Sequence, residues 1–136
     1  MARVLIPFVE PEGALRAVTQ LLREPPDPSL HVHLLAAVEP RVSGMVGIYV
    51  TQQRAEEMVR EAARHWLQPL EAALTAANIP CSSEIAVGPP RTTIRAATAR
   101  ADIDRVVLPP SKHGVLAQLE RGWIRDHSPH PVTLVA

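Results

Sequence analysis

The sequence predicts a single α/β domain over residues 1–136, with a five-stranded parallel sheet and helices on both faces, as in Rossmann-like and flavodoxin-like folds. Two patterns predict this class. Short apolar runs alternate along the chain with apolar stripes of helical spacing, which is typical of successive βαβ units. The short runs are also continuously apolar, which suits strands buried on both faces of a parallel sheet. We therefore expect right-handed crossovers between the strands.

The first strand and the first helix are predicted near the N-terminus. Residues 3–8 (RVLIPF) form a short apolar run and indicate a buried strand. Pro11 marks the start of a helix, because the N–H that proline lacks is not needed in a first helical turn. The apolar stripe of this helix consists of Ala14, Leu15, Val18, Leu21 and Leu22. The segment 24–28 (EPPDP) ends the helix.

The second strand is predicted at Leu30–Val38 (LHVHLLAAV), and a long helix follows it. Residues 41–50 contain two glycines and several apolar residues, which indicates a loop before that helix. Thr51 is the expected N-cap, and an apolar stripe continues from Met58 to Ala77. Pro69 interrupts this stripe and is expected to kink the helix.

Three further strands and two helices complete the predicted order. The strands are expected at residues 81–87 (CSSEIAV), 104–108 and 131–136 (PVTLVA). The helices are expected at residues 91–100 and from Gly114 to about Arg125. Most of the 14 prolines fall between these elements, where they stiffen the connecting loops.

The composition excludes several functional classes. The 14 basic and 14 acidic residues give a formal net charge of zero, so neither nucleic acid nor an anionic membrane is an expected partner. No apolar run approaches the length of a membrane span, and the N-terminus lacks a signal-peptide pattern. Cys81 is the single cysteine. It fits a reducing compartment, and without a cationic or CxxC neighbour it is expected to be inert. We expect a cytoplasmic protein.

The turn after the fourth predicted strand is the leading candidate for a ligand site. In open α/β sheets, ligands bind beyond the carboxyl ends of the strands, and helix N-termini hold anions. This turn opens with Pro109 and Pro110, which offer no N–H to an anion where glycines would be normal. The candidate groups for an anion or a nucleotide are Ser111, Lys112, His113, Gly114 and Gly122.

Three segments carry a family resemblance. They are residues 88–94 (GPPRTTI), 101–108 (ADIDRVVL) and 131–135 (PVTLV). In order and spacing they resemble the turn into the third helix, the AD-x-D-L-I-V-M strand and the closing P-V-L-V-V strand of the universal stress protein (UspA-like) family. The likeness covers essentially the whole chain. It implies an adenine nucleotide alpha hydrolase-like fold and a role in stress response or regulation.

The ATP-binding motif of that family is degenerate in this chain. ATP-binding members carry G-x-x-G, nine residues, and then Gly followed by Ser or Thr. The matching positions here are Pro109, Lys112, Gly122 and Trp123, so only Gly122 is kept. Val9 stands where the family has an Asp that contacts the adenine end of ATP. The resemblance therefore implies that ATP is not bound in the family's usual mode, and no cofactor is expected.

An alternative is a nucleotide or anion binder of a different design. In this interpretation the ammonium of Lys112 and the helix N-terminus at Gly114 replace the glycine loop, and Gly122 still permits close approach. Both interpretations describe a binding protein, because the sequence contains no G-x-S-x-G, no HExxH and no paired carboxylates at a recognisable spacing. Enzymatic activity is not expected.

The histidines favour structural roles over a metal site. His31 and His33 are two residues apart in a predicted strand, so their side chains share one face, but no third ligand lies near them in the sequence. His127 and His130 fall in a predicted turn beside Asp126, where a solvated turn is favoured over a zinc site.

The last predicted strand indicates an interface. If it lies at an edge of the sheet, its N–H and C=O groups are unpaired. The family resemblance implies that this strand pairs with its copy across a two-fold axis. We expect a homodimer formed through Val132, Thr133, Leu134 and Val135. The ligand and any other protein partner stay open.

Overall fold

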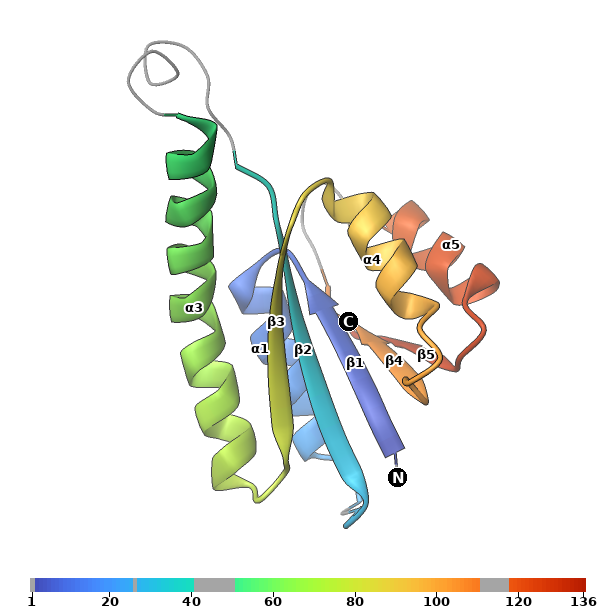
Figure 1. Ribbon diagram of the computed structural model, residues 1–136. Helices are drawn as coiled ribbons and strands as arrows, with labels where there is room; N and C mark the ends of the chain where they lie inside the picture. Colours follow the sequence, from blue (N-terminus) through green and yellow to red (C-terminus); the bar gives the residue numbers. More distant parts are fainter. Residues whose placement is uncertain (1, 26, 41–50, 111–117) are drawn as a thin grey trace.

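The computed structural model describes residues 2–25, 27–40, 51–110 and 118–136, in which strands and helices alternate (Figure 1). The strands are β1 (Ala2–Phe8), β2 (Leu30–Val38), β3 (Cys81–Val87), β4 (Arg105–Leu108) and β5 (Val132–Leu134). The helices are α1 (Pro11–Leu22), α3 (Gln52–Ala76), α4 (Pro90–Thr98) and α5 (Gln118–His127). The loop predicted at 41–50 and the helix start predicted at Gly114 lie outside the described residues.

The five strands form one parallel sheet in the order β3-β2-β1-β4-β5. β1 pairs with β2 along its whole length, from Ala2 opposite Leu30 to Phe8 opposite Ala36. On its other side β1 pairs with β4. β1 is thus the central strand, and β3 and β5 are the edges. The predicted five-stranded parallel sheet is confirmed.

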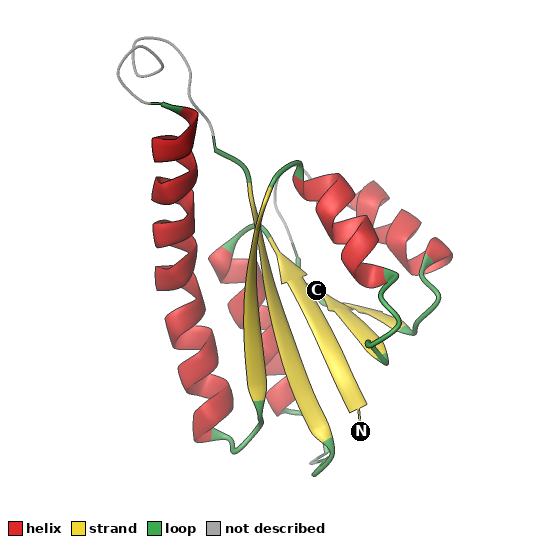
Figure 2. Ribbon diagram, viewed as in Figure 1, coloured by secondary structure: helices red, strands yellow, loops and turns green. Residues whose placement is uncertain are grey.

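Helices cover both faces of the sheet (Figure 2), with α1 and α3 on one face and α4 and α5 on the other. Alternate residues of β1 show the division. Val4, Ile6 and Phe8 belong to the apolar cluster beneath α1 and α3, whereas Leu5 belongs to the cluster beneath α4 and α5. Each of these side chains is buried, and burial of a side chain of this size contributes roughly 1.5–3 kcal/mol to stability.

The long helix α3 shows how local chemistry sets its limits. The Thr51 hydroxyl accepts a hydrogen bond from the Arg54 N–H at 3.1 Å, as predicted for an N-cap. Pro69 lies inside the helix, which nevertheless continues without a break to Ala76. Pro69 is exposed, so the carbonyl that loses its N–H partner can bind water. Among the described residues no helix, α3 included, is both long and apolar enough to cross a membrane.

Candidate functional site

The strand order reverses direction beside β1. From β1 the chain moves to β2 and β3 on one side, and then it crosses to β4 on the other side. Ligands of open α/β sheets bind at such a reversal, beyond the carboxyl ends of the two strands concerned. Those ends are Phe8 of β1 and Leu108 of β4. The turn that begins at Pro109 therefore starts at the β1–β4 switch point, where the sequence predicts the ligand site.

The first turn of α1 lies directly against Pro110 at this switch point. A Cβ added to Gly13 would stand 2.3 Å from the carbonyl oxygen of Pro110 and 3.5 Å from the Cβ of Pro109. Real Cβ atoms do not approach an oxygen so closely, so only glycine fits at this position. Gly13 and Pro109 are buried. The segment that follows β1 and the segment that follows β4 are thus in direct contact at the switch point.

Val9 follows β1 and occupies the position at which the family resemblance implies an adenine-contacting Asp. Its side chain is partly buried and packs against the apolar cluster beneath α4 and α5. No carboxylate is supplied at this position. The structure therefore presents an apolar group at this end of the switch point.

Trp123 is 38% exposed on α5 and contacts Arg95 of α4 and His127 of its own helix. The guanidinium carbon of Arg95 lies 3.7 Å from the centroid of the Trp123 ring, and the His127 ring stacks on Trp123 at 4.2 Å. Arg95 also binds the buried Glu120 carboxylate with two hydrogen bonds, of 2.6 and 3.0 Å. Trp123 therefore helps to join two helices. Nothing in these contacts requires the small hydroxyl that the family motif places here.

Gly122 lies inside α5, four residues after its first described residue. The nearest atom to an added Cβ is Arg125 Nη2 at 4.0 Å, so the described surroundings leave room for a side chain. The other predicted site residues, Ser111 to Gly114, lie outside the described residues. Of the predicted anion-site residues, only Gly122 therefore lies within the part of the chain that the structure describes.

Arg121 is a charged residue at the same edge of the sheet that the sequence analysis did not single out. Its Nη2 donates to the carbonyl of Val135, whose own N–H donates to the carbonyl of Leu108 at 3.0 Å. Arg121 Nε is buried and has no hydrogen-bond partner among the described residues. Burial lowers the pKa of this guanidinium. An arginine in an amphipathic helix gives no signal in a sequence, because only the fold brings it beside the end of β4.

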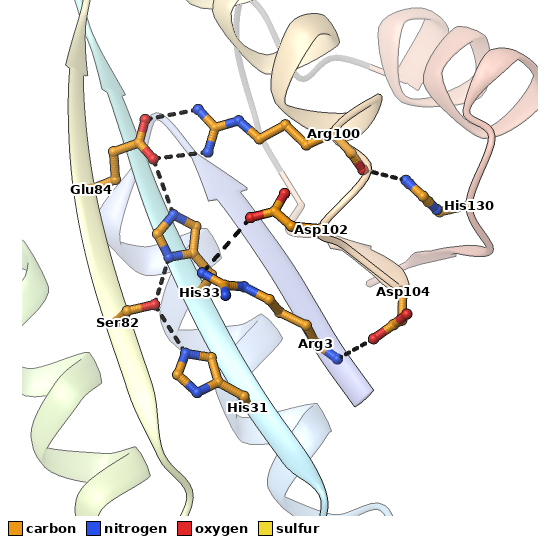
Figure 3. A network of polar contacts seen from close by, with 9 residues as sticks. All are labelled: Arg3, His31, His33, Ser82, Glu84, Arg100, Asp102, Asp104 and His130. Carbon is orange, nitrogen blue, oxygen red and sulfur yellow. Dashed lines mark hydrogen bonds and ion pairs between the residues drawn. The ribbon is translucent and has the colours of Figure 1, made fainter. Parts of the chain in front are cut away.

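A second polar cluster lies on the α4 face of β2 and β3, toward the amino ends of the strands (Figure 3). Ser82 Oγ lies 2.7 Å from His33 Nδ1 and 3.1 Å from His31 Nε2. The other ring nitrogen of His33, Nε2, lies 3.1 Å from Glu84 Oε1. The two histidines share one face, as their spacing predicts. Their partners come from a strand about 50 residues away, which the sequence analysis did not connect with them.

Glu84 is held by a bidentate contact with Arg100, whose Nη1 and Nη2 each donate at 2.8 Å. The Arg100 hydrogen bonds, together with the weaker contribution of His33, lower the pKa of Glu84 to about 2. The carbonyl of Arg100 in turn accepts from His130 Nε2 at 2.6 Å. His130 is thus tied to the α4–β4 turn. This contact gives His130 a structural role, whereas His127, predicted in the same turn, is the last residue of α5.

Metal binding and thiol chemistry find little support in the parts of the chain that the structure describes. These parts contain no group of three or more His, Cys, Asp or Glu side chains placed to hold a metal ion. Burial, followed by the charge of Glu71, raises the pKa of Cys81. The Cys81 thiol therefore stays protonated at neutral pH, which agrees with the inert thiol that the sequence predicts.

Comparison with known proteins places the chain in a family. The model of the universal stress protein family matches residues 1–135. Among curated proteins no sequence matches. Solved structures share the fold, and one of them is a universal stress protein family member from Burkholderia pseudomallei. It has a TM-score of 0.73 at 12% identity, with 98% of this chain and 95% of that chain covered.

Two further structures have the same fold. A universal stress protein family protein from Arabidopsis thaliana with AMP bound matches with a TM-score of 0.69 at 17% identity, over 99% of this chain and 91% of that chain. The universal stress protein UspA from Lactobacillus plantarum matches with a TM-score of 0.68 at 20% identity, over 99% of this chain and 97% of that chain. Identities this low show a shared fold and nothing about the ligand of this chain.

Proposed function

Because the chain belongs to the universal stress protein family, we propose that it is a non-catalytic, cytoplasmic binding protein of the stress response that does not take ATP in the family's usual mode. One observation carries the proposal. At the β1–β4 switch point, Gly13 lies against the carbonyl of Pro110 so closely that no Cβ fits between them. The backbone of α1 thus fills the space beside the start of the turn that would bind the phosphate of a nucleotide.

Two other positions support the proposal from opposite ends of the ligand. Val9 offers an apolar side chain at the adenine end. Trp123 is engaged by Arg95 and His127 at the position where the family motif has a small hydroxyl. A phosphate needs N–H or O–H donors, and an adenine needs polar partners. Because this chain lacks the family's polar groups at both positions, we expect its affinity for ATP to be reduced.

Isothermal titration with ATP and with AMP tests the proposal. AMP belongs in the test because the Arabidopsis relative carries it, and because AMP depends less on a phosphate turn than ATP does. We expect no saturable heat with ATP up to millimolar concentration. Sub-millimolar ATP binding would contradict the proposal, whereas AMP binding alone would restrict it to the triphosphate.

A second candidate function is anion or nucleotide binding through cations. Lys112 lies outside the described residues. Arg121 is a cation beside the end of β4, and its Nε is buried with no hydrogen-bond partner among the described residues. Fixed cations can replace glycine N–H groups as partners of a phosphate. If a ligand is measured, Lys112→Ala and Arg121→Gln should each weaken it. Unchanged affinity in both variants would reject this candidate.

We also propose that the chain forms a homodimer through the open edge of β5. The carbonyl of Pro131 accepts from the Val106 N–H, and the N–H of Val135 donates to Leu108. By alternation, Val132 and Leu134 turn their backbone groups away from β4. Pairing with a second copy would satisfy these groups.

Sedimentation analysis tests the dimer, with Val132→Pro as the matched variant. Proline at this position removes one outward N–H and leaves the bonds to β4 in place. We expect a dimer for the unmodified chain and a shift toward monomer for the variant. A monomer at all working concentrations would reject the proposed interface.

A further inference from the structure

The protons of His31, Ser82 and His33 can be arranged in only one way while both rings are neutral (Figure 3). The Glu84 carboxylate only accepts hydrogen bonds, so His33 carries its proton on Nε2 and leaves Nδ1 as an acceptor. His33 Nδ1 then takes the single proton of the Ser82 hydroxyl. Ser82 Oγ is left to accept, and His31 must donate to it from Nε2. The hydrogen bonds therefore run in one direction, from His31 to Glu84.

This chain of hydrogen bonds limits how many protons the group can hold. A proton added to His31 enters at Nδ1 and leaves the chain intact. A proton added to His33 enters at Nδ1, and Ser82 Oγ then accepts from it. The hydroxyl proton keeps an acceptor within the group only if it turns toward His31, whose Nε2 must then be free of its proton. If both rings are charged, two N–H groups face Ser82 Oγ and the hydroxyl proton has no acceptor within the group. The three hydrogen bonds can therefore persist with at most one extra proton on the two rings.

The surroundings oppose a charge on His31. The charged or titratable groups that face the cluster come from β1, β3, the α4–β4 turn and the α5–β5 turn, and they are Arg3, Glu84, Arg100, Asp102, Asp104 and His130. Arg3 is the neighbour of His31 in the sheet register. Glu84 is already neutralised by Arg100. Burial, and then the charges of Arg3 and His33, lower the pKa of His31 from its ordinary value of 6.5.

We propose that the hydrogen bonds among His31, Ser82 and His33 form a pH-sensitive link, here called the brace, between β2 and the edge strand β3. The brace is complete while the two rings hold at most one extra proton. It fails when both rings are charged. The brace lies away from the β1–β4 switch point, so it does not depend on whether that site binds a ligand. The geometry supports a link between strands rather than a metal site, because Ser82 Oγ occupies the point on which both ring nitrogens converge.

The sign of the pH effect follows from proton binding. Because the pKa of His31 is lower in the folded state, the unfolded chain takes up this proton first as the pH falls. The contribution of His31 to stability is therefore present above about pH 6.5 and is lost as the pH falls below that value. The fold should weaken on mild acidification, before the carboxylates are protonated.

Urea unfolding between pH 8 and pH 5.5 tests the brace with matched variants. His31→Gln keeps an amide donor for Ser82 and removes the titration. His65→Gln is the control, because His65 is an exposed histidine on α3. We expect the urea midpoint of the unmodified chain and of the control to fall on acidification, and that of His31→Gln to fall less. A flat profile for the unmodified chain, or an unchanged slope in His31→Gln, would overturn the proposal.

Ring-nitrogen NMR of the unmodified protein gives a second readout that needs no variant. At pH 7.5 we expect the Nε2–H form for both His31 and His33, and on acidification a midpoint for His31 below that of free histidine. The Nδ1–H form of His33 at pH 7.5 would show that the directed chain does not exist. Ser82→Ala should remove the link between the two rings while leaving both rings in place.

Discussion

Gly13 of α1 and Pro110 after β4 lie in contact at the carboxyl edge of the sheet, so closely that a Cβ added to Gly13 would stand only 2.3 Å from the Pro110 carbonyl oxygen. The two residues are almost 100 positions apart in the chain. Their contact links the first strand–helix unit to the turn that would hold a phosphate. The packing of α1 and the structure of the β1–β4 switch point are therefore coupled.

Gly13→Ala should destabilise the fold, because the new methyl group meets backbone that cannot rotate away. A strained insertion of this kind costs roughly 1–3 kcal/mol, measured as a loss of unfolding free energy in urea. Gly122→Ala is the matched control, since its Cβ would have room inside α5. That variant should gain about 0.5–1 kcal/mol from helix propensity and lower unfolded-state entropy. Equal effects at the two glycines would refute the tight contact.

Glu84→Gln should reduce the acid sensitivity of the fold. The pKa of Glu84 is lowered from its ordinary value of 4.5 to about 2 by Arg100 and His33. Its contribution is therefore present above about pH 4.5 and is lost as the pH falls toward 2. Urea unfolding across this range should show a shallower loss for Glu84→Gln than for the unmodified chain. Glu57→Gln, which alters an exposed pair on α3, should keep the original profile.

Arg95→Ala should cost more stability than Arg91→Ala, although both arginines bind the same carboxylate. Arg95 makes two short hydrogen bonds to Glu120, whereas Arg91 is 63% exposed and lies 3.4 Å away. Removing Arg95 takes two short hydrogen bonds from a buried carboxylate and leaves it with the poorer partner, so the loss of stability should be the larger of the two. Removing an exposed partner costs less than about 1 kcal/mol. Thermal or urea unfolding of the two variants side by side measures the difference.

Trp123→Ser, which restores the hydroxyl of the family motif, should not restore ATP binding. The indole contacts Arg95 and His127, and losing them should cost about 0.5–1 kcal/mol of stability. The new hydroxyl would stand at a partly exposed position on α5, beside Arg95 of α4. Titration with ATP should give the same result as for the unmodified chain. Measurable ATP binding by this single variant would mean that Trp123 alone excludes the nucleotide.

The alternation of strands and helices was predictable from the sequence because it depends on local periodicity. Residues 30–38 and 81–87 stand out as continuous apolar or β-prone runs, and both are strands with the predicted bounds. Pro69 lies within α3, which continues to Ala76. The kink that proline favours stays a prediction, because the bounds of a helix do not measure its bend.

The side-chain clusters were not predictable, because they depend on which distant residues the sheet register brings together. The spacing of His31 and His33 gives one shared face, but only the pairing of His33 with Ser82 reveals the partner. Similarly, a glycine in a helix gives no sign that Pro110 will lie against it. The family motif suggested a place for Trp123 near phosphate, whereas its actual contacts follow from its position on α5.

The central claim is that the β1–β4 switch point does not take ATP in the family's usual mode. The most direct measurement is an NMR titration that follows the backbone amides of Val9 and Gly13, which flank this point, while ATP is added to millimolar concentration. We predict no saturable shift of either amide. Shifts at both amides that saturate together below millimolar ATP would contradict the account.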